Sequence, residues 1–99
     1  MPARVRPYKL SPLAISDLED IWLYTCTNWS AEQADRYHGD LVIAFEALAA
    51  ERKIGRVVDI RAGYLKYAVG AHIVFYRLSD SSLDVIRILH QKMDVGMHL

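Results

Sequence analysis

The chain has 99 residues, of which 53% are hydrophobic and 24% are charged. These proportions are typical of a soluble globular domain and exclude a disordered chain. Twelve Lys and Arg residues balance twelve Asp and Glu residues, which excludes a strongly basic protein that binds nucleic acid through many phosphate contacts. We therefore expect a single domain spanning residues 1–99, with no direct sequence-specific binding to DNA.

Several classes of site are excluded by the absence of their motifs. The single cysteine, Cys26, cannot form an internal disulfide, and the histidines do not have the spacing of zinc ligands. The sequence has no glycine-rich phosphate loop and no nucleophile elbow. It also has no signal-peptide core and no stretch near the ~20 apolar residues that span a bilayer. We expect a cytoplasmic protein without metal, cofactor or membrane segment.

The first expected elements are an edge strand and a helix. Residues 5–10 read as a short strand, and Pro7 confines it to the edge of a sheet because proline cannot donate to a central ladder. Ser11 followed by Pro12 is a favoured helix start, in which Ser11 caps the first amides and Pro12 loses no hydrogen bond. Apolar residues then recur at helical spacing, which predicts a helix as far as Asn28.

A second helix is expected directly afterwards. Ser30 and Gln33 form a capping box, and an apolar face then continues to about Ala50. Gly39 lies inside this helix at a cost of ~1 kcal/mol relative to alanine, which predicts that another backbone approaches there. Two helices with so short a connection form an antiparallel hairpin.

The last third of the chain is expected to form a three-stranded antiparallel meander. It follows a basic loop with short extended pieces over residues 51–62. Gly70 comes first in a two-residue turn, which is typical of a type II′ hairpin, and four polar residues form the second turn. The order of elements indicates an α+β fold of two layers, with the helical hairpin on one face of the sheet. The strands expected are residues 64–69, 72–78 and 83–89.

Cationic residues on this meander are the candidates for chemistry. Along the last strand, alternation puts Leu83, Val85, Arg87 and Leu89 on one face and His90 on the other, unless a β-bulge intervenes. In the preceding strand, Arg77 has the parity that places it on the same face as Arg87. Two neighbouring guanidinium groups repel each other and need an anion.

The residues alone leave three interpretations open. In the first interpretation, the two arginines form ion pairs with Asp59, Asp84 or Asp94 at the margin of the sheet, which is the commonest outcome for arginines on strands. In the second interpretation, a cation stabilises the charge that develops during RNA cleavage, while His90 or a tyrosine carries the proton. In the third, arginines and aromatic side chains anchor a protein partner, since both are enriched at interfaces.

Six stretches of sequence, taken together in their order and spacing, form a pattern that covers nearly the whole chain. They include the strand and helix start, the middle of the second helix, and all of the meander. The stretches are YKLSPLA at residues 8–14, DLEDIW at 17–22, QADRY at 33–37, YAVG at 67–70, HIVFYR at 72–77 and VIRILHQKMD at 85–94.

With these stretches the chain resembles the ParE toxins of the RelE/ParE superfamily, the toxin half of type II toxin–antitoxin modules. The resemblance implies a helical hairpin packed against a small antiparallel sheet. It also implies a toxin that inhibits bacterial growth and is neutralised by an antitoxin, whose disordered C-terminal segment folds as it wraps the toxin. ParE-like members are associated with inhibition of DNA gyrase, whereas RelE-like relatives cleave mRNA in the ribosome.

The C-terminal tail favours the ParE branch. RelE-like nucleases have a C-terminal tyrosine in a basic catalytic set, whereas here no tyrosine follows Tyr76. The resemblance therefore implies a non-enzymatic toxin that acts on gyrase and has no catalytic residues. The alternative is a ribosome-dependent mRNA endonuclease that needs no metal. Arg87→Ala is expected to lower toxicity and to leave the fold intact.

Candidate contact residues follow from these two expected partners. Cations in and around the meander are candidates for target binding, and apolar residues of the helices are candidates for antitoxin binding. The target-binding candidates are Arg61, Lys66, Arg77, Arg87, His90 and Lys92, and the antitoxin-binding candidates are Leu18, Trp22, Tyr37 and Phe45.

Overall fold

The computed structural model of the protein describes residues 6–99. The expected strand, two helices and three-stranded meander are all present. The helices and the strands of the meander have bounds within about one residue of the predicted ones, but the first strand begins at Tyr8 and leaves out Arg6 and Pro7, which were predicted to belong to it. The two-residue strand lies in the stretch expected to contain short extended pieces, and the short C-terminal helix was not predicted. The elements are β1 (Tyr8–Leu10), α1 (Pro12–Asn28), α2 (Ala31–Ala49), β2 (Arg56–Val57), β3 (Leu65–Val69), β4 (His72–Leu78), β5 (Leu83–His90) and α3 (Val95–His98).

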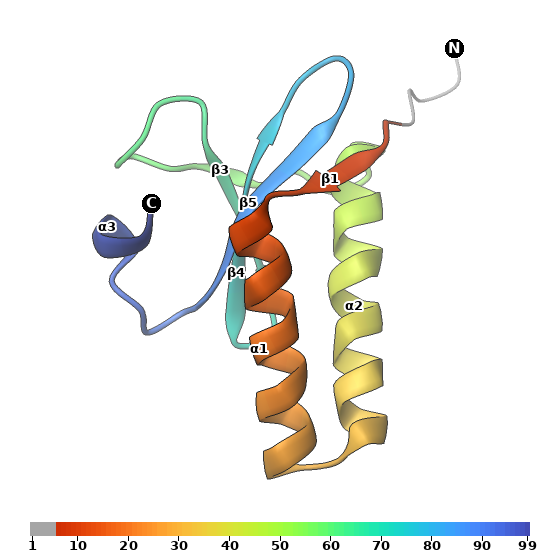
Figure 1. Cartoon of the computed structure of the whole chain (residues 1–99). Helices are drawn as coiled ribbons and strands as arrows, with labels where there is room; N and C mark the ends of the chain where they lie inside the picture. The colour runs from red at the N-terminus through yellow and green to blue at the C-terminus, as the bar shows by residue number, and fades with distance from the viewer. Residues whose placement is uncertain (1–5) are drawn as a thin grey trace.

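The strands form one five-stranded sheet in the order β1-β5-β4-β3-β2. β3, β4 and β5 are the antiparallel meander, while β1 pairs with β5 in parallel and makes the sheet mixed. Helices α1 and α2 lie side by side in front of one face of the sheet (Figure 1). The predicted α+β fold and the edge position of the first strand are therefore confirmed; Val5, in the predicted strand, lies outside the described residues.

Ser11 joins the start of α1 to the sheet. Its hydroxyl accepts a hydrogen bond from the amide of Ala14 at 3.0 Å and donates one to the carbonyl of Ile86 at 2.7 Å. The Ser11 amide also donates to the carbonyl of Val85. The residue that caps the helix thus continues the pairing of β1 with β5, which fixes where α1 crosses the edge of the sheet.

Gly70 and Gly39 differ in the space that surrounds them. Gly70 has φ +55°, and Ala71 has no positive φ, as the predicted type II′ turn requires. A Cβ at Gly70 would approach the Tyr37 ring to 2.8 Å. A Cβ at Gly39, inside α2, would meet nothing within 4 Å. The predicted close approach of another backbone at Gly39 is therefore wrong.

A β-bulge divides β5 into two halves that present opposite faces. Tyr76 pairs with Val85, but Phe75 pairs with Arg87, so that Ile86 has no partner of its own. One extra residue inverts the alternation of side chains. Leu83 and Val85 consequently pack against the helices, whereas Leu89 packs on the opposite side, and the predicted single face for the odd-numbered residues is wrong.

The sheet has a core on each side. The larger one lies beneath α1 and α2, and residues such as Phe45, Leu41 and Val74 are fully buried in it. On the other side, Phe75, Leu89 and Val58 are buried, with Val95 and Leu99 from the α3 region packed against them. We call these the helix side and the outer side of the sheet.

Candidate partner-binding surfaces

Arg87 is held by Asp17 of α1. Its Nε donates to Asp17 Oδ2 at 2.8 Å and its Nη2 donates to Oδ1 at 2.9 Å, which is a bidentate ion pair. The two side chains are only 15% and 13% exposed. The hydrogen bonds to Asp17 raise the pKa of Arg87. The prediction of an ion pair at the sheet margin is confirmed for Arg87 alone, and the acid is Asp17 and not Asp59, Asp84 or Asp94.

Asp17 also completes the edge of β5. The same Oδ2 accepts a hydrogen bond from the amide of Ile88 at 2.9 Å, beyond the point where pairing with β1 ends. The carboxylate takes the place of a neighbouring strand at that position. Arg87 is therefore part of the structure, and the expectation that Arg87→Ala leaves the fold intact no longer holds.

Arg61 and Arg77 share one aromatic ring. The guanidinium carbon of Arg61 lies 5.4 Å from the centroid of Tyr64, and that of Arg77 lies 5.8 Å from it. Within residues 6–99, neither arginine makes an ion pair with an Asp or Glu side chain. Arg61 also donates to the backbone carbonyl of Leu99. These two exposed arginines form a cationic pair on the outer side, next to α3.

The other target-binding candidates are dispersed. Lys66 is exposed on β3, opposite Phe75, beside a depression that also includes Arg56. Lys92 is exposed and its backbone amide donates to Nδ1 of His90 at 3.2 Å. The structure therefore brings Arg61 and Arg77 together and leaves Lys66, Arg87 and His90 in separate surroundings.

A histidine pair lies on the helix side. His72 of β4 is opposite His90 of β5, and their rings meet edge to face with centroids 5.4 Å apart. Tyr37 of α2 hydrogen-bonds both Nδ1 of His72, at 2.7 Å, and the carbonyl of Val69, at 2.8 Å. Burial and the neighbouring His90 lower the pKa of His72. Burial raises the pKa of Tyr37, although the backbone amides of Ala71 and His72 oppose that effect.

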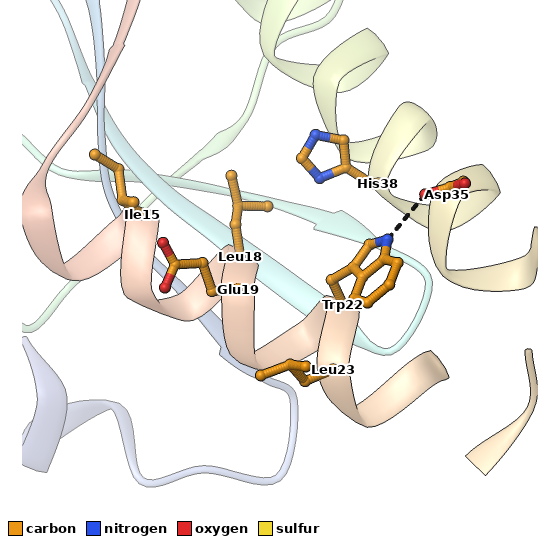
Figure 2. A pocket seen from close by; sticks show the side chains of 7 residues that line it. All are labelled: Ile15, Leu18, Glu19, Trp22, Leu23, Asp35 and His38. Carbon is orange, nitrogen blue, oxygen red and sulfur yellow. Dashed lines mark hydrogen bonds between the residues drawn. The ribbon is translucent and has the colours of Figure 1, made fainter. Parts of the chain in front are cut away.

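An open groove of about 590 Å³ lies along the surface of the helical hairpin and is lined by residues of α1 and α2. Figure 2 shows Ile15, Leu18 and Leu23 along α1 and the Trp22 indole reaching toward α2, where its Nε1 donates to Asp35 at 2.9 Å. Leu23 is 58% exposed. An apolar groove of this kind, with a few polar groups at its rim, is typical of a peptide-binding site. The lining residues are Ile15, Leu18, Glu19, Trp22, Leu23, Asp35 and His38.

The antitoxin-binding candidates fall into two groups. Leu18 and Trp22 line the groove. Tyr37 is half-buried and contacts His72, and Phe45 is 0% exposed in the helix-side core. Because Phe45 has no accessible surface, a partner cannot contact it directly. Ile15 and Leu23 are exposed apolar residues of the groove that were not predicted, and their apolar character at exposed helix positions is the signal that would have found them.

Residues 6–99 contain neither a cluster of metal-binding side chains nor a helix that could span a membrane. In this part of the chain, no three His, Cys, Asp or Glu side chains are placed to hold a metal ion. None of the helices described there is both long and apolar enough to cross a membrane.

Comparison with known proteins agrees with the fold and the motifs. Residues 8–95 match the family described as the ParE toxin of type II toxin–antitoxin system, parDE. Toxin ParE1 of Mycobacterium tuberculosis is 45% identical over 93% of this chain and 96% of its own length. Toxin ParE1 of Caulobacter vibrioides is 41% identical over 96% of this chain and 99% of its own.

Two solved structures share the fold. The chromosomal ParDE toxin–antitoxin system of P. aeruginosa contains a chain with TM-score 0.75 and 19% identity, covering 87% of this chain and 96% of that one. The RelBE2 toxin–antitoxin complex of Mycobacterium tuberculosis contains one with TM-score 0.63 and 18% identity, covering 89% and 100%. From the family match and the two ParE1 relatives, this chain belongs to the ParE toxin family of type II toxin–antitoxin systems.

Proposed function

We propose that the protein inhibits bacterial growth from within the cytoplasm by acting on DNA gyrase, and that a cognate antitoxin neutralises it by binding the groove on α1 and α2. The observation that carries the proposal is the open apolar groove, which remains uncovered when the two cores of the sheet are complete. The two similar folds come from toxin–antitoxin systems, which supports a protein partner of this kind.

The chemistry of the groove favours an amphipathic segment. Leu18, Leu23 and Ile15 offer apolar surface to one side of a partner helix, and Glu19 and Asp35 are exposed acids in the same lining. A partner segment with apolar residues at helical spacing and basic residues beside them matches this pattern. Folding of that segment on the groove would cover the exposed side chains of Ile15 and Leu23.

The choice of gyrase over RNA rests on the state of the cations. A nuclease needs a free cation beside a proton carrier to stabilise the charge on the cleaved phosphate. Arg87 is neutralised by Asp17, and Arg61 and Arg77 lie around Tyr64 on the outer side. Exposed arginines around an aromatic ring suit contact with a protein target, since both residue types are enriched at interface hot spots.

The second candidate is a ribosome-dependent mRNA endonuclease. The pairing of His72 with His90 favours it, because two imidazoles can act as acid and base. However, no Lys or Arg side chain lines the pocket that contains them. Supercoiling by purified gyrase and the integrity of ribosome-bound mRNA distinguish the two candidates. Loss of supercoiling with intact mRNA is expected, and cleaved mRNA with normal supercoiling would reverse the assignment.

Leu23→Glu tests the groove, with Leu13→Glu as a matched control. Both leucines are on α1 and both are 58% exposed, but only Leu23 lines the groove. Placing a carboxylate in the apolar lining is expected to weaken antitoxin binding by about 2 kcal/mol, which is about 30-fold. Titration calorimetry with the antitoxin from the neighbouring reading frame measures this. Equal affinities for the two variants would show that the antitoxin binds elsewhere.

A further inference from the structure

A second, smaller pocket of about 250 Å³ contains the histidine pair. His72 and His90 line it from the sheet, Tyr37 lines it from α2, and Tyr24 and Trp29 line it from the end of α1 and the connection to α2. Tyr24 and Trp29 are 62% and 68% exposed, and their rings lie 6.0 Å apart. The pocket therefore has a polar floor and an aromatic rim that is open to solvent.

The hydrogen bonds define the protonation state of each ring nitrogen. The Val69 carbonyl can only accept, so the Tyr37 hydroxyl donates to it, and Nδ1–H of His72 donates to the Tyr37 oxygen. Nε2 of neutral His72 then carries a lone pair. Nδ1 of His90 accepts from the amide of Lys92, so Nε2 of neutral His90 carries the proton.

Both Nε2 atoms are accessible and unpaired within residues 6–99. Neither makes a hydrogen bond to the described part of the protein. The only buried side-chain nitrogen or oxygen without a partner in that part is Nε of Arg6, so the two imidazole nitrogens reach solvent. The pocket thus offers one donor and one proton acceptor on adjacent rings.

The charges around the pair favour a carboxylate as the ligand. No Asp, Glu, Lys or Arg side chain lines the pocket, in contrast to the groove with Glu19 and Asp35. A phosphate backbone would find no fixed cation there, whereas a single carboxylate needs only the proton that one imidazole can take up. The exposed Tyr24 and Trp29 suit the apolar stem and the neighbours of a peptide side chain.

We propose that this pocket binds an Asp or Glu side chain of the antitoxin, with His90 Nε2–H donating to one carboxylate oxygen and a newly protonated His72 Nε2 donating to the other. The inference rests on the proposed function only for the identity of the partner. The proton comes from solvent, so each binding event takes up one proton. Neutralisation of the toxin then becomes stronger as the pH falls.

The surroundings of His72 support this direction. Burial and then His90 lower the pKa of His72, so the ring is neutral at neutral pH in the free protein. Asp17 of α1 acts in the opposite sense, but its carboxylate is already bound to Arg87. On α2, Tyr37 donates its hydroxyl proton to Val69. A carboxylate placed in the pocket would favour the imidazolium and raise the pKa of His72.

His72→Asn tests the proposal, because the Asn amide can retain the hydrogen bond to Tyr37 while the titrating Nε2 is lost. The affinity for the purified antitoxin is measured between pH 5.5 and pH 8. The wild type is expected to bind up to about tenfold more tightly for each unit of pH decrease. His72→Asn is expected to lose this dependence, and His98→Asn, an exposed histidine outside the pocket, to keep it. A flat wild-type profile, or an undiminished slope in His72→Asn, overturns the proposal.

A second measurement uses the free protein and separates this inference from the proposed function. The imidazole proton signals of His72 are followed by NMR against pH, with and without acetyl-glutamate N-methylamide. The glutamate derivative is expected to raise the pKa of His72 in the wild type and to have no such effect in His90→Asn. No shift overturns the pocket assignment even if the antitoxin binds. A shift with inorganic phosphate alone overturns it in favour of a nucleic-acid ligand. Failure of the antitoxin to bind the wild type at any pH would instead reject the proposed function.

Discussion

The two sides of the sheet differ in what covers them. On the helix side, two long helices bury a continuous core that includes Leu41 and Phe45. On the outer side, the four-residue α3 and its flanking residues cover only the small cluster around Phe75, and the exposed Arg61 and Arg77 lie over Tyr64, which packs against that cluster. Figure 1 shows the same asymmetry, with α3 well apart from the hairpin. The difference indicates that stability resides mainly on the helix side, and the target contact that we propose is placed on the outer side.

The largest expected effect tests this division of stability. Phe45→Ala removes a fully buried ring from the helix-side core and is expected to lower the free energy of unfolding by about 3–5 kcal/mol. Val95→Ala, at the partly buried edge of the outer cluster, is expected to cost about 1 kcal/mol or less. Urea denaturation followed by circular dichroism measures both. Similar losses would mean that α3 contributes as much as the hairpin.

A smaller effect separates the two kinds of arginine. Arg87→Ala leaves the Asp17 carboxylate without its guanidinium partner in a largely buried site, which is expected to cost about 2–4 kcal/mol of stability. Arg77→Ala removes an exposed side chain and is expected to change stability by no more than about 0.5 kcal/mol.

A toxicity assay reports on a different property in each of these two variants. Reduced toxicity of Arg77→Ala at normal protein levels would support a target contact on the outer side, because its fold is expected to be unchanged. Reduced toxicity of Arg87→Ala must first be corrected for the loss of folded protein. If the midpoints of urea unfolding of the two variants coincide, the structural role assigned to the Arg87–Asp17 pair is wrong.

The smallest effect concerns the helical layer. Gly39→Ala is expected to stabilise the protein by up to about 1 kcal/mol, because the position has open space and alanine has the higher helix propensity. Gly70→Ala is the contrasting change, since φ is +55° and the Tyr37 ring lies in the way. Thermal unfolding measures both shifts. A destabilised Gly39→Ala variant would indicate that α2 is packed more tightly at this point than the structure describes.

Most of the fold could be predicted from local signals. Ser11 with Pro12, and Ser30 with Gln33, placed the starts of both long helices because capping depends on residues within one turn. Gly70 likewise identified the β3–β4 turn, because few other residues adopt its backbone conformation without strain. The order of the strands in the meander followed from the short turns between them.

The sites were less predictable because they depend on one irregularity and on contacts between distant residues. Without the bulge, counting back from the pairing of Leu78 with Leu83 would place His72 opposite Leu89; the extra residue places it opposite His90. Asp17 entered the sequence analysis only as the first residue of the DLEDIW stretch, and nothing local indicates that it faces Arg87. Ile15 and Leu23 were overlooked as groove residues because the core face of α1 was the stronger signal.

The sequence by itself determined the α+β class and the bounds of the main helices and strands, because these follow from periodicity, caps and turns over short distances. The family followed from the resemblance of six stretches of sequence to those of ParE toxins. Tertiary structure decided which cations are free, which apolar helix residues are exposed and which histidines meet. Those properties depend on where α1 crosses the edge of β5 and on the register of β5 against β4, which are set by packing between residues far apart in the chain.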